Sequence, residues 1–199
     1  MSDEAIIVVG SGVGGLAAAI ELAAAGRRVT VLERAAEPGG KMRQLRVGDR
    51  GVDSGPTVFT MRWIFDALLA SAGTTLEEQL TLHEADVLAR HAWRSGGVLD
   101  LFASTDRSAE AIETFSDRDN ARGYREFCAR SAAIYATLRE PYIASPRPGM
   151  FELVRRVGFH RLDEMWRTAP FSTLWSALGQ HFSDPRLRQL FGRYATYVG

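Results

Sequence analysis

The sequence is poor in the residues that build metal sites and disulfide frameworks. Among its 199 residues, Cys128 is the only cysteine, and the 4 histidines are scattered without the short spacings of metal ligands. A single thiol excludes an internal disulfide framework and a cysteine-cluster metal site, and the scattered histidines argue against a zinc site. We therefore expect no metal to be bound.

Net charge and long apolar runs are also missing. The 24 Lys and Arg residues balance the 24 Asp and Glu residues, whereas nucleic-acid-binding proteins usually carry a basic excess that neutralises phosphates. No apolar run approaches the ~18 residues that suggest a transmembrane helix, and residues 1–4 lack the basic start of a secretory signal. The sequence predicts a cytoplasmic protein without a nucleic-acid partner, in which any membrane contact is peripheral.

Residues 5–33 have the pattern of a strand, a tight turn, a helix and a second strand. An apolar run precedes a glycine cluster, an Ala- and Leu-rich helix is predicted over 13–25, and Gly26 ends it before the second apolar run at 29–32. Both strands are apolar at nearly every position, as parallel strands covered by helices on each face must be. The fold class is therefore α/β, with a Rossmann-like βαβ unit at its start.

The turn-rich residues 34–60 contain several Gly and Pro residues and favour loops and short strands. Apolar residues then recur at helical spacing over 61–72, and Gly73 closes that helix. Three further segments have an extended pattern, at 80–84, 87–93 and 98–102, with a glycine-containing turn at 95–97 between the last two.

The remaining sequence is helical in pattern. One predicted helix has an apolar face from Tyr124 to Leu138 and is ended by Pro141, and another starts at Asp184 and Pro185 as cap and first-turn proline. From these changes of character we predict three parts: 1–60 as part of a cofactor-binding domain, 61–104 as a helix with short strands, and 105–199 as a helical region.

The glycine cluster reads Gly10, Ser11, Gly12, Val13, Gly14, Gly15 and satisfies the G-x-G-x-x-G pattern directly between a strand and a helix. In that context the first glycine permits the sharp turn, the second lets a pyrophosphate approach the backbone, and the last allows the helix to pack closely on the strand. The phosphates then bind at the positive end of the helix dipole. The alternative is a glycine-rich turn that only changes the direction of the chain.

Glu33 ends the second strand and strengthens the dinucleotide interpretation. It follows Gly12 by 21 positions, where a carboxylate can accept hydrogen bonds from both hydroxyls of an adenosine ribose. Its charge would repel a 2′-phosphate, which disfavours NADP and leaves FAD and NAD. The alternative is a solvated acid at the end of a strand.

The segments after Glu33 resemble those of FAD-dependent flavoproteins. The run from Glu33 through Pro38, Gly39, Gly40, Lys41 and Met42 to Arg43 is similar to their extended motif of a glycine pair and a basic residue, and Val52 to Thr57 resembles the D-x-G-P-T segment of the phytoene-desaturase branch. Many such flavoproteins carry arginine where this chain has Lys41, which keeps the charge but loses a planar bidentate donor. The resemblance implies FAD as the cofactor, bound by Gly10, Ser11, Gly12, Gly14, Gly15, Glu33, Arg34, Gly39, Gly40, Lys41, Met42, Gly55, Pro56 and Thr57.

The resemblance extends over nearly the whole chain to bacterial carotenoid desaturases, and its most specific part is the closing segment 184–199, DPRLRQLFGRYATYVG. Members of that family are much longer, so the resemblance implies that this chain is their N-terminal portion, carries an incomplete flavoprotein fold and is inactive alone. It also implies FAD-dependent desaturation of an acyclic hydroxy- or methoxy-carotenoid, a lipophilic substrate, by hydride transfer from a substrate C–H to the flavin. The alternatives are a redox-neutral carotenoid cis–trans isomerase on the same scaffold and a non-enzymatic nucleotide-fold escort protein.

No catalytic acid or base is evident from sequence. Glu152 lies where some relatives carry a carboxylate, and the alternative for it is a solvated helix-surface acid. Arginines and apolar residues alternate over 151–167, which fits either a membrane-associated face or a solvated helix. Aromatic residues fit either a polyene tunnel or the ordinary core; these are Trp63, Phe65, Phe127, Tyr135, Trp166, Trp175 and Phe191.

Overall fold

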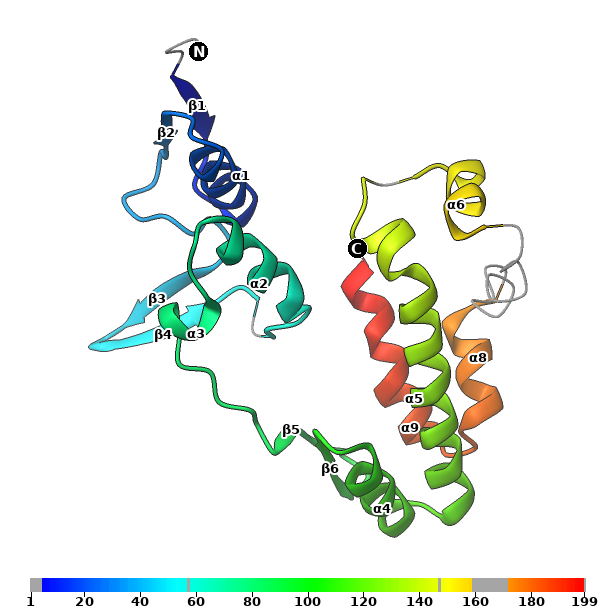
Figure 1. Ribbon diagram of the computed structural model, residues 1–199. Helices are drawn as coiled ribbons and strands as arrows, with labels where there is room; N and C mark the ends of the chain where they lie inside the picture. The colour runs from blue at the N-terminus through cyan, green and yellow to red at the C-terminus, as the bar shows by residue number, and fades with distance from the viewer. Residues whose placement is uncertain (1–4, 57, 147, 159–171, 199) are drawn as a thin grey trace. The chain divides into compact units, whose positions relative to one another are not determined.

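The computed structural model describes residues 5–56, 58–146, 148–158 and 172–198. They gather into two compact units, one up to His83 and one from Glu84 onward (Figure 1). The predicted boundaries at residues 60 and 104 stay predictions.

The first unit opens with the predicted βαβ arrangement. Strands β1 (Ile6–Val9) and β2 (Val29–Leu32) pair in parallel, with Ile6 opposite Val29, and helix α1 (Val13–Ala24) connects them. Gly26, at φ +75°, lies just after α1 and allows the chain to turn back into β2. The alternation of a glycine cluster, a helix and a second apolar strand was therefore interpreted correctly.

Among the described residues, a helix packs on only one face of this strand pair. Helix α1 packs on the face that carries Val8, whereas Ile7 and Val9 on the other face are 60% and 84% exposed. Helix α2 (Arg62–Ser71) packs against α1 and does not cover β1 among the described residues. The prediction that helices cover both faces of the strands is thus wrong for the described part of the chain.

The rest of the first unit is a hairpin and two helices. Strands β3 (Arg43–Val47) and β4 (Arg50–Ser54) pair antiparallel, as the turn-rich sequence of this part predicts. Helix α3 (Leu76–Gln79) starts at a capping box in which Thr75 and Glu78 satisfy each other's backbone N–H groups.

The second unit begins with a hairpin and a helix. Strands β5 (Val87–Ala92) and β6 (Val98–Phe102) pair antiparallel, and the N–H of Gly96 donates to the carbonyl of Trp93 in the turn (3.0 Å). Helix α4 (Thr105–Phe115) follows. Residues 80–84 were predicted to be extended, and the described residues give them no strand partner.

Helices form the remainder of this unit. The longest, α5 (Arg118–Leu138), continues as a π-helical turn, η1 (Arg139–Ile143), so the α-helix ends three residues before Pro141. After it come α6 (Met150–Val157), α8 (Leu174–His181), α9 (Pro185–Gly192) and the 3₁₀ segment η3 (Arg193–Val198). Asp184 caps α9 and Pro185 occupies its first turn, as predicted.

Residues of β6, α4, α5, α8 and α9 form the hydrophobic core of the second unit. Figure 1 shows α5 running beside α8 and α9, and aromatic rings fill the space between these helices. Phe182 stacks on Phe191 with ring centroids 5.0 Å apart, and Tyr124 and Phe127 of α5 lie against Phe191 at 5.6 and 5.4 Å. Burial of large aromatic surfaces is a major source of stability, so these rings hold the helices together.

Candidate nucleotide-binding site

The glycine loop between β1 and α1 presents backbone donors at the start of a helix. Gly10, at φ +98°, makes the turn, and its N–H donates to the carbonyl of Leu32 (2.7 Å). Gly12 is the N-cap residue of α1, and no side chain caps that end of the helix. No side chain therefore occupies the positive end of the helix dipole, a position that favours phosphate oxygens.

The glycines of this loop have two distinct steric roles. A Cβ built on Gly15 would lie 1.9 Å from the carbonyl oxygen of Gly10, so this glycine allows α1 to approach the loop. A Cβ built on Gly12 or Gly14 would meet no atom of the described residues within 4 Å. Packing among these residues therefore gives no reason for the absence of a side chain at Gly12, whereas a ligand lying on the loop gives one.

The carboxylate of Glu33 lies at the glycine loop. Its Oε2 accepts hydrogen bonds from the N–H and the hydroxyl of Ser11, both at 2.8 Å, and its Oε1 accepts from the N–H of Ala35 at 2.9 Å. These donors, with Ala35 first, lower the pKa of the Glu33 carboxyl to about 2. Glu33 is therefore ionised at neutral pH, beside the loop on which phosphates would bind.

Two more glycine segments meet the first. The N–H of Gly39 donates to the carbonyl of Ser11 (2.8 Å), and a Cβ on Gly40 would lie 3.1 Å from the Cα of Gly12. Gly55 lies still closer to the Lys41 carbonyl, because a Cβ on Gly55 would lie 2.0 Å from the Lys41 oxygen. Residues from three predicted cofactor segments are therefore brought together by backbone approaches that only glycine permits.

The other predicted cofactor residues lie around these glycines. Arg34, Lys41, Met42 and Pro56 are exposed, so their side chains are accessible to a ligand. Thr57 lies outside the described residues. Sequence had predicted each of these positions from the family resemblance, and their roles in binding stay predictions.

Glu152 occupies an unsuitable environment for a general base. Its carboxylate, on α6, accepts hydrogen bonds at 2.8 Å from Arg155 and from Arg156. These two guanidinium groups, Arg155 first, lower the pKa of Glu152 to about 2. A carboxylate held by two arginines has little tendency to take a proton, so the geometry favours the alternative of a helix-surface acid.

The aromatic residues considered for a tunnel belong to both units. In the second unit, Phe191 is a core residue and Phe127 packs against that core; in the first unit, Phe65 pairs with Phe59 at 4.9 Å. Trp175 is exposed and carries the Arg188 guanidinium over its ring, Tyr135 is also exposed, and Trp63 is half-buried. Trp166 lies outside the described residues, as does most of the 151–167 segment considered for a membrane face.

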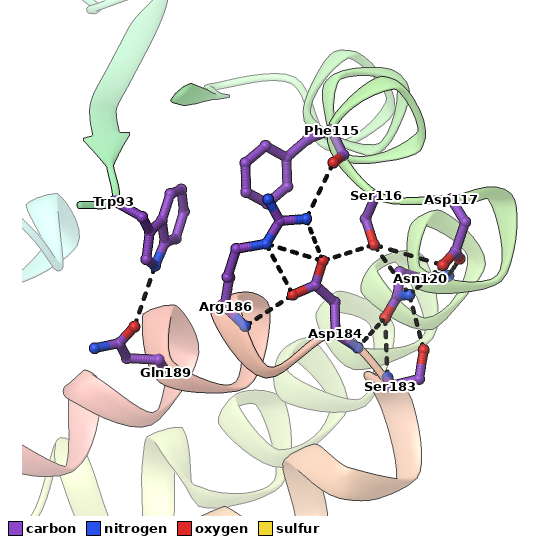
Figure 2. Close-up of polar contacts among 9 residues, drawn as sticks. All are labelled: Trp93, Phe115, Ser116, Asp117, Asn120, Ser183, Asp184, Arg186 and Gln189. Carbon is purple, nitrogen blue, oxygen red and sulfur yellow. Dashed lines mark hydrogen bonds and ion pairs between the residues drawn. The ribbon is translucent and has the colours of Figure 1, made fainter. Parts of the chain in front are cut away.

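Sequence reasoning missed a buried polar network in the second unit, drawn in Figure 2. Asn120 of α5 is 1% exposed. Its Oδ1 accepts from the N–H groups of Ser183 and Asp184 at 3.0 and 3.3 Å, and its Nδ2 donates to Asp117 at 2.8 Å. One amide side chain thereby ties the start of α5 to the loop between α8 and α9.

Asp184 extends the network toward α4. Its carboxylate accepts from the hydroxyl of Ser116 (2.9 Å) and from the guanidinium of Arg186 (2.6 Å), which is the main cause of its lowered pKa of about 2. Arg186 also lies over the ring of Phe115, 3.9 Å from its centroid (Figure 2). The sequence signal was the start of a helix at Asp184; the long-range partners were not predictable from it.

Comparison with known proteins identifies a matching domain family and related chains. Residues 8–69 match the family model described as an NAD(P)-binding Rossmann-like domain, which confirms the α/β fold class. The chain is 51% identical over 195 residues to a hydroxyneurosporene desaturase of Rubrivivax gelatinosus, an alignment covering 98% of this chain and 37% of the relative. It is 44% identical over 199 residues to a hydroxyneurosporene desaturase of Rhodobacter capsulatus, covering 100% of this chain and 40% of that relative.

A phytoene dehydrogenase of Streptomyces griseus is more distant, at 33% identity over 202 residues, covering 98% of this chain and 38% of the relative. The chain thus spans about two fifths of the length of the curated relatives it matches. Among the described residues, none of the helices has both the length and the apolar character needed to cross a membrane. In the same residues, no group of three His, Cys, Asp or Glu side chains is placed to hold a metal ion.

Proposed function

We propose, from the premise that this chain is a homologue of bacterial carotenoid desaturases over about two fifths of their length, that it binds FAD and serves the desaturation of an acyclic carotenoid. The observation that carries the proposal is the convergence of three glycine segments, at Gly12, Gly40 and Gly55, with an ionised Glu33 at their edge. The finer expectation from sequence is an acyclic 1-hydroxycarotenoid 3,4-desaturase, also called methoxyneurosporene dehydrogenase.

The local chemistry fits FAD better than NADP. The uncapped start of α1 and the bare backbone at Gly12 suit a pyrophosphate. Lys41 directly follows Gly40, which lies against Gly12, and can offset the charge of the pyrophosphate. Glu33 stays ionised well below neutral pH, so a 2′-phosphate on the ribose would meet a negative charge. The second glycine segment distinguishes FAD from NAD, because the family resemblance assigns that segment to flavoproteins.

When bound, FAD would supply the redox chemistry, as the acceptor for a hydride from a substrate C–H. The chain's own residues bind and orient the cofactor: the glycine loop donates N–H groups to phosphate, and Glu33 accepts from the ribose. They also provide apolar surface beside the Gly55 loop, where Val58, Phe59 and Met61 are exposed. Such a surface suits a lipophilic polyene and keeps water away from it.

The proposed substrate class suggests a cellular location for the protein. Carotenoids dissolve in lipid, so we propose a cytoplasmic enzyme with peripheral contact to the cytoplasmic membrane face. Helix α6 supports this contact, because Phe151 is exposed while Arg155 lies near it on the same helix.

The decisive experiment expresses the full-length protein in cells that accumulate neurosporene-type carotenoids. We expect stoichiometric FAD in the purified protein, and a pigment that absorbs at longer wavelength and has lost two hydrogens by mass. A pigment of unchanged mass but altered cis–trans geometry would instead identify an isomerase. Unchanged pigments together with a flavin-free protein would support the escort alternative and overturn the proposal.

Replacing Gly12 by alanine separates ligand binding from folding. Because a Cβ there meets nothing within 4 Å, we expect an unchanged unfolding transition, together with FAD affinity lowered about tenfold or more by the methyl group on the phosphate surface. Fluorescence quenching on flavin binding and thermal unfolding followed by circular dichroism measure the two effects. Equal FAD affinity of variant and wild type would place the phosphates elsewhere.

Replacing Glu152 by glutamine tests the catalytic alternative for that residue. Since its carboxylate is held by Arg155 and Arg156 and is a very weak base, we expect the desaturation rate to change less than about threefold. The rate is measured under saturating substrate with an excess of electron acceptor. A decrease of a hundredfold or more would assign Glu152 to the proton transfer after all.

A further inference from the structure

Met61 has a strained backbone. In the part of the chain that the structure describes it is the only non-glycine residue with a positive φ, at φ 52° and ψ 47°. In this left-handed region the Cβ of an ordinary residue crowds the next carbonyl oxygen, whereas glycine has no Cβ and asparagine tolerates the conformation. The turn leads the chain into α2, where the ring of Phe59 lies against that of Phe65 (4.9 Å). The geometry thus requires a left-handed residue here, but not a methionine.

Met61 also leaves the start of α2 without a cap. It is the N-cap residue of that helix, and its side chain accepts no hydrogen bond from the first turn. Asparagine, aspartate and serine are favoured at this position because their side-chain oxygens accept from those N–H groups. The Met61 side chain is 41% exposed, so burial among the described residues does not offset the strain. Local stability therefore gives no reason for a methionine, and strain of this kind is typical of functional sites.

The surface around Met61 is apolar. Val58 and Phe59 precede it and are also exposed. Arg62, the next residue, forms ion pairs with acids on α2 and α3, so its charge is already balanced within the chain. The surface at 58–61 therefore suits an apolar ligand rather than an anion.

This apolar surface belongs to the edge of the candidate cofactor site. Met61 follows Gly55 by six positions, at most about 20 Å along an extended chain. Gly55 lies against the Lys41 carbonyl, at 2.0 Å for an added Cβ. Gly40, beside Lys41, in turn lies against Gly12. A substrate that has to reach the cofactor can thus touch Met61.

We propose that Met61 is a substrate-contacting residue, whose side chain packs on the apolar chain of an acyclic carotenoid and holds it beside the cofactor. The inference rests on the proposed function, since it takes a lipophilic polyene as the substrate. The unbranched, polarizable thioether adapts its shape to a long apolar ligand. This contact, rather than folding, is the reason for a methionine in a left-handed conformation.

The test uses the full-length, FAD-loaded protein with carotenoid supplied in liposomes. Met61→Asn keeps the left-handed turn and adds a capping oxygen, and Met61→Gly removes the strain. For both variants we expect KM for the carotenoid to rise about fivefold or more, as the loss of buried apolar surface implies. We expect kcat and the dissociation constant of FAD to stay within about twofold of wild type. The thermal unfolding midpoint should be equal to or higher than that of wild type.

Two further variants act as controls. Met61→Leu restores an apolar side chain of similar size, so its KM should stay within about twofold of wild type. Leu80→Asn is the matched control for Met61→Asn, because Leu80 is another exposed apolar residue of the first unit and has an ordinary φ of −138°. Its KM should not change.

Each outcome decides the matter. Unchanged KM in both Met61→Asn and Met61→Gly overturns the inference, and so does an equal rise in Leu80→Asn. A lowered unfolding midpoint in Met61→Gly and Met61→Asn also overturns it, because Met61 would then be packed against another part of the full-length chain. These results leave FAD binding and desaturation by the wild type, and with them the proposed function, intact. A wild-type protein that neither binds FAD nor desaturates the carotenoid overturns the proposed function, and the inference falls with it.

Discussion

Replacing Gly15 by alanine is expected to abolish FAD binding and to destabilise the first unit. The added Cβ would lie 1.9 Å from the carbonyl oxygen of Gly10, so α1 would have to move away from the glycine loop. Overpacking of this kind costs about 1–3 kcal/mol, against a gain of about 1 kcal/mol for alanine in a helix. We expect a net loss of up to about 2 kcal/mol and no measurable flavin retention.

Gly14→Ala is the matched control, since it makes the same change one residue earlier in the same helical turn. A Cβ on Gly14 meets nothing within 4 Å, so this variant should be as stable as the wild type or about 1 kcal/mol more stable. Urea unfolding followed by circular dichroism, with flavin content after gel filtration, measures both variants. If Gly15→Ala retained flavin and stability, the close approach of α1 to the glycine loop would be refuted.

Replacing Asn120 by alanine is expected to cost the second unit about 3 kcal/mol or more of unfolding free energy. The change removes the acceptor of the Ser183 and Asp184 N–H groups and the donor to Asp117. A buried group left without its partner costs about 1–3 kcal/mol, and Asn120 itself is 1% exposed. Water therefore cannot replace the lost bonds without opening the junction between α5 and the loop before α9.

Urea unfolding monitored by tryptophan fluorescence reports this loss, because Trp93 and Trp175 belong to the second unit. Thr114→Ala is a suitable control, since that exposed hydroxyl donates to the Glu110 carbonyl of its own helix; a change within about 0.5 kcal/mol is expected. A similarly small change for Asn120→Ala would show that the network contributes little to stability.

Local patterns predicted much of the fold. The βαβ unit, the helix at 62–71 and the hairpin at 87–102 follow from the spacing of apolar residues and from glycine turns, which act within a few residues. The same holds for the start of α9 at Asp184 and Pro185. The first glycine segment of the candidate site was located in the same way, because the pattern itself requires a strand before it and a helix after it. The segments at Gly39, Gly40 and Gly55 were located from the family resemblance.

Features that depend on distant partners were not predictable. Ser11 and Glu33 are 22 positions apart, and Asn120 and Ser183 are 63 positions apart. No periodicity indicates such pairs, since their contact is created by the packing of helices and loops. The same reason explains the uncovered face of β1, whose apolar sequence predicts burial without showing which segment covers it. Glu152 differs, because Arg155 and Arg156 lie three and four positions along the same helix, a spacing that is visible in the sequence.

That uncovered face has a consequence for the production of this segment. Ile7 and Val9 are 60% and 84% exposed and, among the described residues, nothing covers their face of β1. We expect a polypeptide limited to these residues to aggregate when it is overproduced, because exposed apolar strands of folding intermediates promote aggregation.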